Sequence, residues 1–70
     1  MLESVEVLES KKVNTSKGLM IFEIVEERMG SYVKKFYTAQ DFREGQEFDK
    51  TRDYKDEKGY RAAIKRYSKL

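Results

Sequence analysis

Residues 19–25 read Leu19-Met20-Ile21-Phe22-Glu23-Ile24-Val25, and six of these seven residues are apolar. The run is much shorter than the roughly 20 apolar residues that a membrane-spanning helix needs. A bounded apolar run of this length is typical of a β-strand that is covered on both faces. We therefore expect this heptapeptide to lie at the centre of a small antiparallel sheet.

Length and composition limit what the rest of the chain can be. A chain of 70 residues is expected to form one domain, residues 1–70, with a thin core. It contains no cysteine and no histidine, so disulfides, thiolate metal sites and the commonest metal ligand are excluded. Its first residues lack the basic and apolar regions of a signal peptide. We expect a soluble, cytoplasmic protein with no metal, cofactor or membrane contact.

Two further strands are predicted on either side of the heptapeptide. A first strand is expected over residues 5–13, with a change of phase near Leu8 that suggests a β-bulge. A polar turn closed by Gly18 then leads into the central strand, residues 19–28. Gly30 lies in a tight connection to a third strand, residues 32–39. Each face of that third strand carries one lysine, which is typical of a strand near a sheet edge.

The segment that follows the third strand allows two interpretations. Thr38 and Asp41 could begin a helical turn that ends at Gly45, or the segment could be a polar loop. A short fourth strand carrying Phe48 is possible over residues 46–50.

The C-terminal segment has the pattern of an amphipathic helix. Asp53 is the expected N-cap, and the helix dipole favours the acidic residues that follow it. Gly59 is expected to allow close packing of the helix on the sheet. The predicted fold class is therefore α+β: an antiparallel β-meander of three to four strands with a C-terminal amphipathic helix packed on one face. The predicted core consists of Val5, Val7, Leu19, Ile21, Phe22, Ile24, Val25, Val33, Phe36 or Tyr37, Phe48, Tyr60, Ala63, Ile64 and Tyr67.

The sequence contains serines, glycines and carboxylates, but they do not form the patterns that catalytic sites require. The serines have no histidine to activate them, and the four glycines are isolated rather than gathered in a phosphate-binding loop. Most carboxylates lie among lysines, as on a solvated surface. Glu23 interrupts the apolar run and is interpreted as a half-buried structural glutamate. We do not expect an enzyme.

Positive charge gathers at the C-terminal end of the chain. Residues 51–70 contain seven Lys or Arg against three Asp or Glu. On a helix, the cations form a stripe opposite the apolar face, which predicts a phosphate-contacting surface for nucleic acid. The alternative is a solvated helix exterior. The predicted nucleic-acid-binding residues are Lys34, Lys35, Lys58, Arg61, Lys65, Arg66 and Lys69.

Aromatic and basic residues alternate in the third strand. Tyr32 and Phe36 could stack on bases beside the two lysines, or could anchor a protein partner. The function we expect is therefore a small module that binds nucleic acid. The alternative is an interaction or inhibitory module that binds a larger protein through a sheet edge or aromatic patch. A continuous surface formed by the helix and sheet cations would favour nucleic acid.

Overall fold

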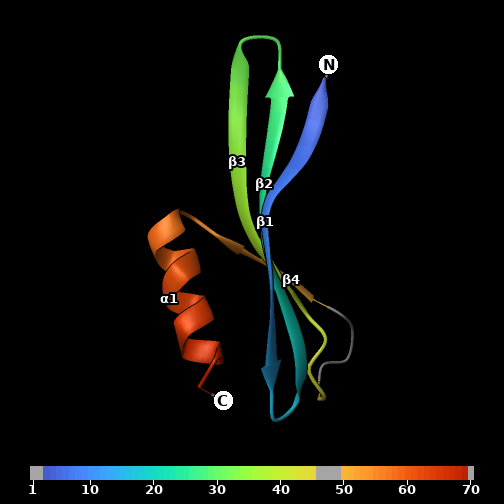
Figure 1. Ribbon diagram of the computed structural model, residues 1–70, viewed down its shortest axis with the longest axis vertical. Helices are drawn as coiled ribbons and strands as arrows, with labels where there is room; N and C mark the ends of the chain where they lie inside the picture. Colours follow the sequence, from blue (N-terminus) through green and yellow to red (C-terminus); the bar gives the residue numbers. More distant parts are fainter. Residues whose placement is uncertain (1–2, 46–49, 70) are drawn as a thin grey trace.

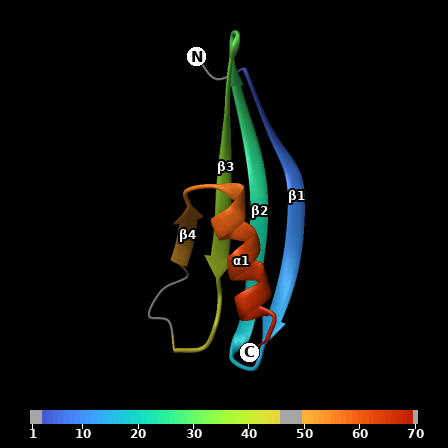
Figure 2. The same cartoon turned by 90° about the vertical axis from the view of Figure 1, so that its left-hand side faces the viewer.

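The computed structural model describes residues 3–45 and 50–69 of the chain. Its strands form one antiparallel sheet in the order β1-β2-β3-β4, and the helix α1 packs on one face of that sheet (Figures 1 and 2). The predicted α+β meander is confirmed. The elements are β1 (Ser4–Thr15), β2 (Gly18–Met29), β3 (Tyr32–Asp41), β4 (Lys50–Tyr54) and α1 (Glu57–Tyr67).

Glycines at the two hairpin turns set the register of the long strands. Gly18 has a φ of +138°, and a Cβ there would lie 3.0 Å from the Cα of Arg43. Gly30 has a φ of +61° and opens the two-residue turn that pairs Met29 with Tyr32. A glycine at the first central position is what a type II′ hairpin turn requires.

The apolar heptapeptide lies in β2, between β1 and β3, as predicted. On the helix side, Met20, Phe22 and Ile24 are buried. On the opposite side, Leu19 and Val25 are only half-buried. The prediction that both faces are covered is wrong, because the described residues supply one helix and no layer on the other side of the sheet.

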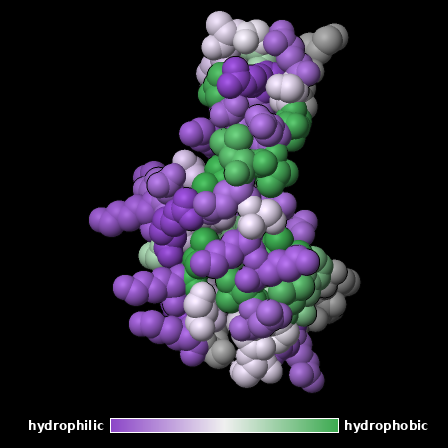
Figure 3. Space-filling model, in the orientation of Figure 1, coloured by the Kyte–Doolittle hydropathy of each residue, from purple (hydrophilic) through white to green (hydrophobic). Residues whose placement is uncertain are grey.

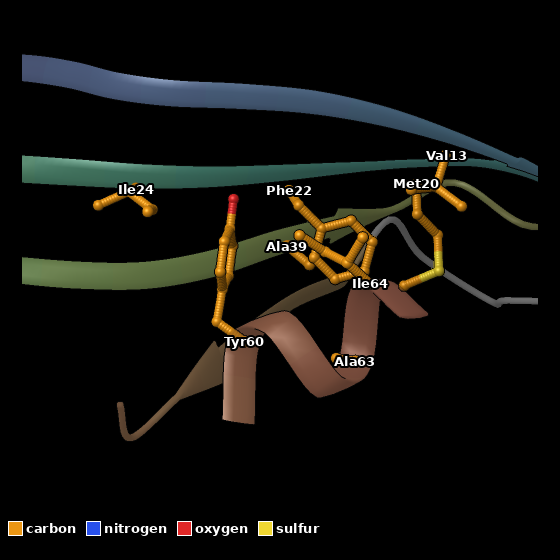
Figure 4. Close-up of a cluster of buried hydrophobic side chains, with 8 residues drawn as sticks. All are labelled: Val13, Met20, Phe22, Ile24, Ala39, Tyr60, Ala63 and Ile64. Carbon is orange, nitrogen blue, oxygen red and sulfur yellow. The ribbon is translucent and has the colours of Figure 1, made fainter. Parts of the chain in front are cut away.

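The core lies between the sheet and α1 and contains the rings of Phe22 and Tyr60 among aliphatic side chains (Figure 4). The ring of Phe22 lies 5.9 Å from that of Tyr60, 6.3 Å from that of Tyr54 and 6.2 Å from that of Tyr67, measured between centroids. Aromatic pairs at these spacings are stabilising beyond the area they bury. The buried apolar residues are Val13, Met20, Phe22, Ile24, Ala39, Tyr60, Ala63 and Ile64.

The predicted bulge in the first strand is confirmed, and it decides which side chains reach the core. The pairing of β1 with β2 shifts between Val7 and Glu9. The extra residue changes the alternation, so Val13 joins the core while Val5 and Val7 project on the side away from the helix. Both valines are exposed, and their predicted burial is wrong.

The sheet is much longer than the helix that covers it. A helix of 11 residues is about 16 Å long, whereas a strand of 12 residues spans about 40 Å. The molecule measures 42 × 24 × 16 Å, and a ribbon of β1, β2 and β3 extends beyond the helix (Figure 1). We call this ribbon, residues 4–8 and 26–35, the arm, and the other described residues the body. Val33 lies in the arm and is exposed, contrary to its predicted burial.

The helix begins later than predicted. Asp53 belongs to β4, and the N-cap is Asp56, whose Oδ1 accepts a hydrogen bond from the backbone N–H of Gly59 at 2.8 Å. A Cβ on Gly59 would meet this carboxylate at 3.3 Å. The absence of a side chain at Gly59 therefore leaves space for the carboxylate of the N-cap, and not for the sheet as predicted.

The ambiguous segment after the third strand is resolved in favour of sheet and loop. Strand β3 continues through Asp41, and residues 42–45 form no helical turn. The fourth strand runs from Lys50 to Tyr54, later than predicted. The predicted core residue Phe48 lies outside the described residues.

Candidate interaction surfaces

The outer face of α1 carries exposed cations. Tyr60, Ala63 and Ile64 are buried against the sheet, and the opposite side of the helix presents Lys58 and Lys65 to solvent. Lys69, just beyond the helix, is also exposed. No acidic residue follows Glu57 in the chain. The predicted cationic stripe therefore exists as a surface.

Arg61 is tied to the sheet. Its Nη1 lies 2.6 Å from Oε2 of Glu9, which also accepts a hydrogen bond from the Tyr60 hydroxyl at 3.1 Å. The hydrogen bond from Arg61 lowers the pKa of Glu9. Burial, and then the bond to Glu9, raise the pKa of Tyr60 to about 12. Because Glu9 follows the bulge, the change of phase aims its carboxylate at the helix.

Arg66 also has an intramolecular contact. Its guanidinium lies 5.0 Å from the centroid of the Tyr67 ring, within the range of a cation–π interaction. Of the five predicted cations in this segment, two therefore engage neighbouring side chains. Lys58, Lys65 and Lys69 form no ion pair within the described residues.

The two sheet lysines lie on opposite faces of β3. Lys35 is on the side that carries α1, where its neighbour on β2 is Glu26. Lys34 is on the far side, opposite Glu27, and its Nζ lies 5.0 Å from the centroid of the Phe36 ring. Successive strand residues point to opposite faces, so this division follows from their adjacency. The seven predicted cations do not form one continuous surface.

Tyr32 and Phe36 share the side of the sheet that faces away from the helix. Tyr32 is 59% exposed and pairs with Met29 beside the hairpin turn. Phe36 is half-buried opposite Val25. Both aromatic rings therefore lie on an uncovered face, with Lys34 between them in sequence.

The arm carries most of the exposed large hydrophobic side chains of the described residues. Seven large hydrophobic side chains are exposed, and all but Phe42 belong to the arm. Figure 3, which views the molecule from the β1 side, shows hydrophobic surface along the arm between its hydrophilic tip and the hydrophilic helix. The exposed hydrophobic residues of the arm are Val5, Val7, Leu8, Met29, Tyr32 and Val33. Val5, Val7, Met29 and Tyr32 lie on the side of the sheet away from the helix, whereas Val33 lies on the helix side. Sequence reasoning assigned Val5, Val7 and Val33 to the core and named only Tyr32 as a possible interface residue.

The arm also has two strand edges without a neighbour in the part of the chain that the structure describes. Strand β1 pairs only with β2, on its inner side. Strand β4 pairs with residues 37–41 of β3 and leaves residues 32–36 unpaired on that side. Each such edge presents backbone N–H and C=O groups that can pair with another chain.

A buried carboxylate joins the end of the sheet to the loop and to β4. Asp41 is fully buried, and its oxygens accept hydrogen bonds from the Nε and Nη2 of Arg43 at 3.0 and 2.9 Å. Arg52 donates to the same carboxylate at 3.1 Å. The bond from Arg43 is the main reason that the pKa of Asp41 falls to about 2. The buried carboxylate is therefore paired with two guanidinium groups, which is typical of a structural group.

The described residues form no pocket and no cluster of acidic side chains able to hold a metal ion. Within residues 3–45 and 50–69, no helix is long and apolar enough to cross a bilayer. Comparisons of the chain with family models, curated proteins and solved structures found no match.

Proposed function

We propose that this chain is a protein-interaction module and that the arm is its contact surface. The observation that carries the proposal is the concentration of exposed apolar side chains in the arm, where six of the seven lie. Apolar surface gathered in one place on a small domain is typical of an interaction site. In the body, the same strands bury their apolar residues on the helix side and leave those on the opposite side half-buried, so fully exposed apolar side chains are concentrated in the arm.

The backbone of the arm supports the same proposal. The unpaired edges at β1 and at residues 32–36 of β3 can each accept an added strand. In such β-augmentation, main-chain hydrogen bonds give affinity and alternate side chains give specificity. Val5, Val7 and Leu8 provide apolar contacts along the β1 edge. The partner we propose is therefore a protein that contributes an extended, partly apolar strand.

The test compares the arm with the one exposed hydrophobic residue outside it. A variant with Val5→Thr and Val7→Thr keeps β-branched side chains and removes the apolar contacts. Phe42→Gln is the matched control, because Phe42 is exposed in the body. In nuclease-treated lysate of the cells that encode the chain, the wild type and the control should retain the same protein, and the arm variant should lose it.

The captured complex must also show where the contact lies. Hydrogen exchange of the complex should slow at the β1 edge or at residues 32–36, since new strand pairing protects backbone amides. Protection confined to α1, or retention of the protein by the arm variant, would contradict the proposal.

Nucleic-acid binding is a second candidate, and the outer face of α1 is the observation that favours it. Lys58, Lys65 and Lys69 are exposed there. If these three cations contact the phosphates of duplex DNA, the log–log salt slope of binding should be about −2.7. Lys65→Glu should weaken this binding, whereas Lys34→Glu, on the far side of the sheet, should not. The absence of a gel shift at low salt would reject this candidate.

A further inference from the structure

The outer edge of β1 has charges arranged so that it can pair with itself. Before the bulge this strand carries Glu6, and after it come Glu9, which is already paired with Arg61, and then Lys11 and Lys12. The side chains of Glu6, Lys11 and Lys12 are exposed, and none of the three forms an ion pair within the described residues. In an antiparallel pair of identical strands, the first half of each lies against the second half of the other. The acidic first half of each β1 strand would therefore lie against the basic second half of the other, which gives two equivalent contacts.

Because of the bulge, the side chains of opposite charge in the two halves of β1 also point to the same side of the sheet. Glu6 is on the helix side of the sheet before the bulge, beside Glu26, and Lys11 is on the helix side after it, beside Phe22. Residues that face each other across an antiparallel pair point to the same side. Without the change of phase at Leu8, Glu6 and Lys11 would lie on opposite faces and could not be opposite neighbours.

These constraints select one register for a pair of β1 strands. With the two-fold axis between Leu8 and Glu9, Glu6 faces Lys11 of the second copy, and Val7 faces Ser10 of the second copy. Moving the strands by two residues in one direction places Glu6 against Glu9, which is a like-charge contact. Moving them in the other direction places Glu6 against Val13 and removes the ionic contact.

We propose that a second copy of this chain is the partner, and that the two copies pair antiparallel through β1 in this register. The inference rests on the proposed function, because it identifies what binds the arm. Each arm then lies beside the body of the other copy, and the two sheets become continuous. Both helices lie on the same side of the joined sheet, because rotation about a two-fold axis perpendicular to the sheet maps each face of the sheet onto itself.

In this register, side-chain contacts across the interface add to the backbone hydrogen bonds between the two β1 strands. Val5 faces Lys12 of the second copy, whose aliphatic stem can cover the valine while its ammonium group stays in water. The Glu6–Lys11 contact occurs twice by symmetry. A single charge reversal therefore changes two contacts at once, which makes the register testable.

Sedimentation of the intact chain tests the dimer, and a charge swap tests the register. The wild type should sediment as a reversible dimer of two 8.3 kDa chains. Glu6→Lys alone and Lys11→Glu alone should each weaken dimerisation about tenfold, since two attractive pairs become repulsive. The double variant restores both pairs and should return the dissociation constant to near the wild-type value.

Matched controls separate the ionic contact from net charge and from folding. Lys17→Glu makes the same change of net charge as Lys11→Glu, but in the exposed β1–β2 turn outside the paired stretch, and should leave dimerisation unchanged. The far-ultraviolet circular dichroism of every variant should match that of the wild type. A double variant that stays as weak as the single variants would overturn the register.

The outcomes distinguish this inference from the broader proposal. A chain that remains monomeric at high concentration, yet captures a different protein through the arm, overturns the dimer and leaves the proposed function in place. A monomer that captures nothing overturns both. A dimer unaffected by Glu6→Lys associates elsewhere and overturns the β1 interface.

Discussion

The body and the arm share the strands β1, β2 and β3, yet large hydrophobic side chains are buried in the body and exposed in the arm. All eight buried hydrophobic residues lie in the body, and six of the seven exposed ones lie in the arm. The difference comes from coverage: α1 reaches only the body (Figure 2). Strand pairing therefore sets the length of this sheet, and the helix sets how much of it becomes a core.

The arm is held by weaker interactions than the body. Its charged pairs are Glu26 with Arg28, at 2.9 Å, and the facing neighbours Glu27 and Lys34. The side chain of Arg28 is 56% exposed, and ion pairs near the surface are worth about 1 kcal/mol or less. We expect the arm to open locally at lower free energy than the body, as uncovered segments do.

The largest expected effect is the loss of the central ring of the body. Phe22→Ala should lower the free energy of unfolding by about 4 kcal/mol, because it empties a site that contacts three tyrosine rings. Tyr32→Ala in the arm should cost about 0.5 kcal/mol or less, since that side chain is exposed. Urea denaturation followed by circular dichroism measures both. Equal costs for the two substitutions would abolish the distinction between body and arm.

The second prediction compares a buried carboxylate in each region. Asp41→Asn should cost about 3 kcal/mol, because it leaves the guanidinium groups of Arg43 and Arg52 without their counter-charge. Glu26→Gln in the arm should cost less than about 1 kcal/mol, since Arg28 remains solvated. Chemical denaturation of both variants near neutral pH provides the comparison.

The same carboxylate predicts the response to acid. The pKa of Asp41 is about 2 in the folded state against an ordinary value of 3.8. Its contribution is therefore complete above pH 3.8 and is lost as the pH falls toward 2. The wild type should lose stability in this range more steeply than Asp41→Asn. Parallel acid profiles for the two proteins would show that Asp41 is not the group responsible.

The architecture could be predicted from the sequence because its signals are local. The apolar heptapeptide, the glycine turns and the spacing of Tyr60, Ala63 and Ile64 each specify an element without reference to distant residues. The wrong burial of Val5, Val7 and Val33 has a different cause. Burial depends on what covers a strand, and an alternating pattern does not contain that information.

The length of the elements was the signal that could have revealed the arm. A helix of 11 residues spans about as far as five strand residues, so a hairpin of two strands with 10 to 12 residues must extend beyond it. The division of Lys34 from Lys35 between the two faces of β3 was predicted and is confirmed, since neighbours in a strand face opposite sides. The cluster around Asp41 was not, because no spacing of charges indicates which carboxylate will be buried.

An effect smaller than those of Phe22→Ala and Asp41→Asn is expected at the border of the two regions, where Glu9 follows the bulge. Tyr60→Phe removes the hydrogen bond to Glu9 and should cost about 1 kcal/mol. Tyr54→Phe is the matched control: its hydroxyl is buried and has no hydrogen-bond partner in the described residues, so its removal should be neutral or slightly stabilising. Thermal and urea denaturation can resolve the two.

Alkaline pH gives an independent measurement of the same bond. The pKa of Tyr60 is raised from 10.0 to about 12 in the folded state, so its contribution is complete below pH 10 and is lost as the pH rises toward 12. Tyr60→Phe should therefore flatten the loss of stability over this range, and Glu9→Gln should flatten it only in part, since burial is the larger cause. A profile unchanged by Tyr60→Phe would mean that another tyrosine controls the alkaline transition.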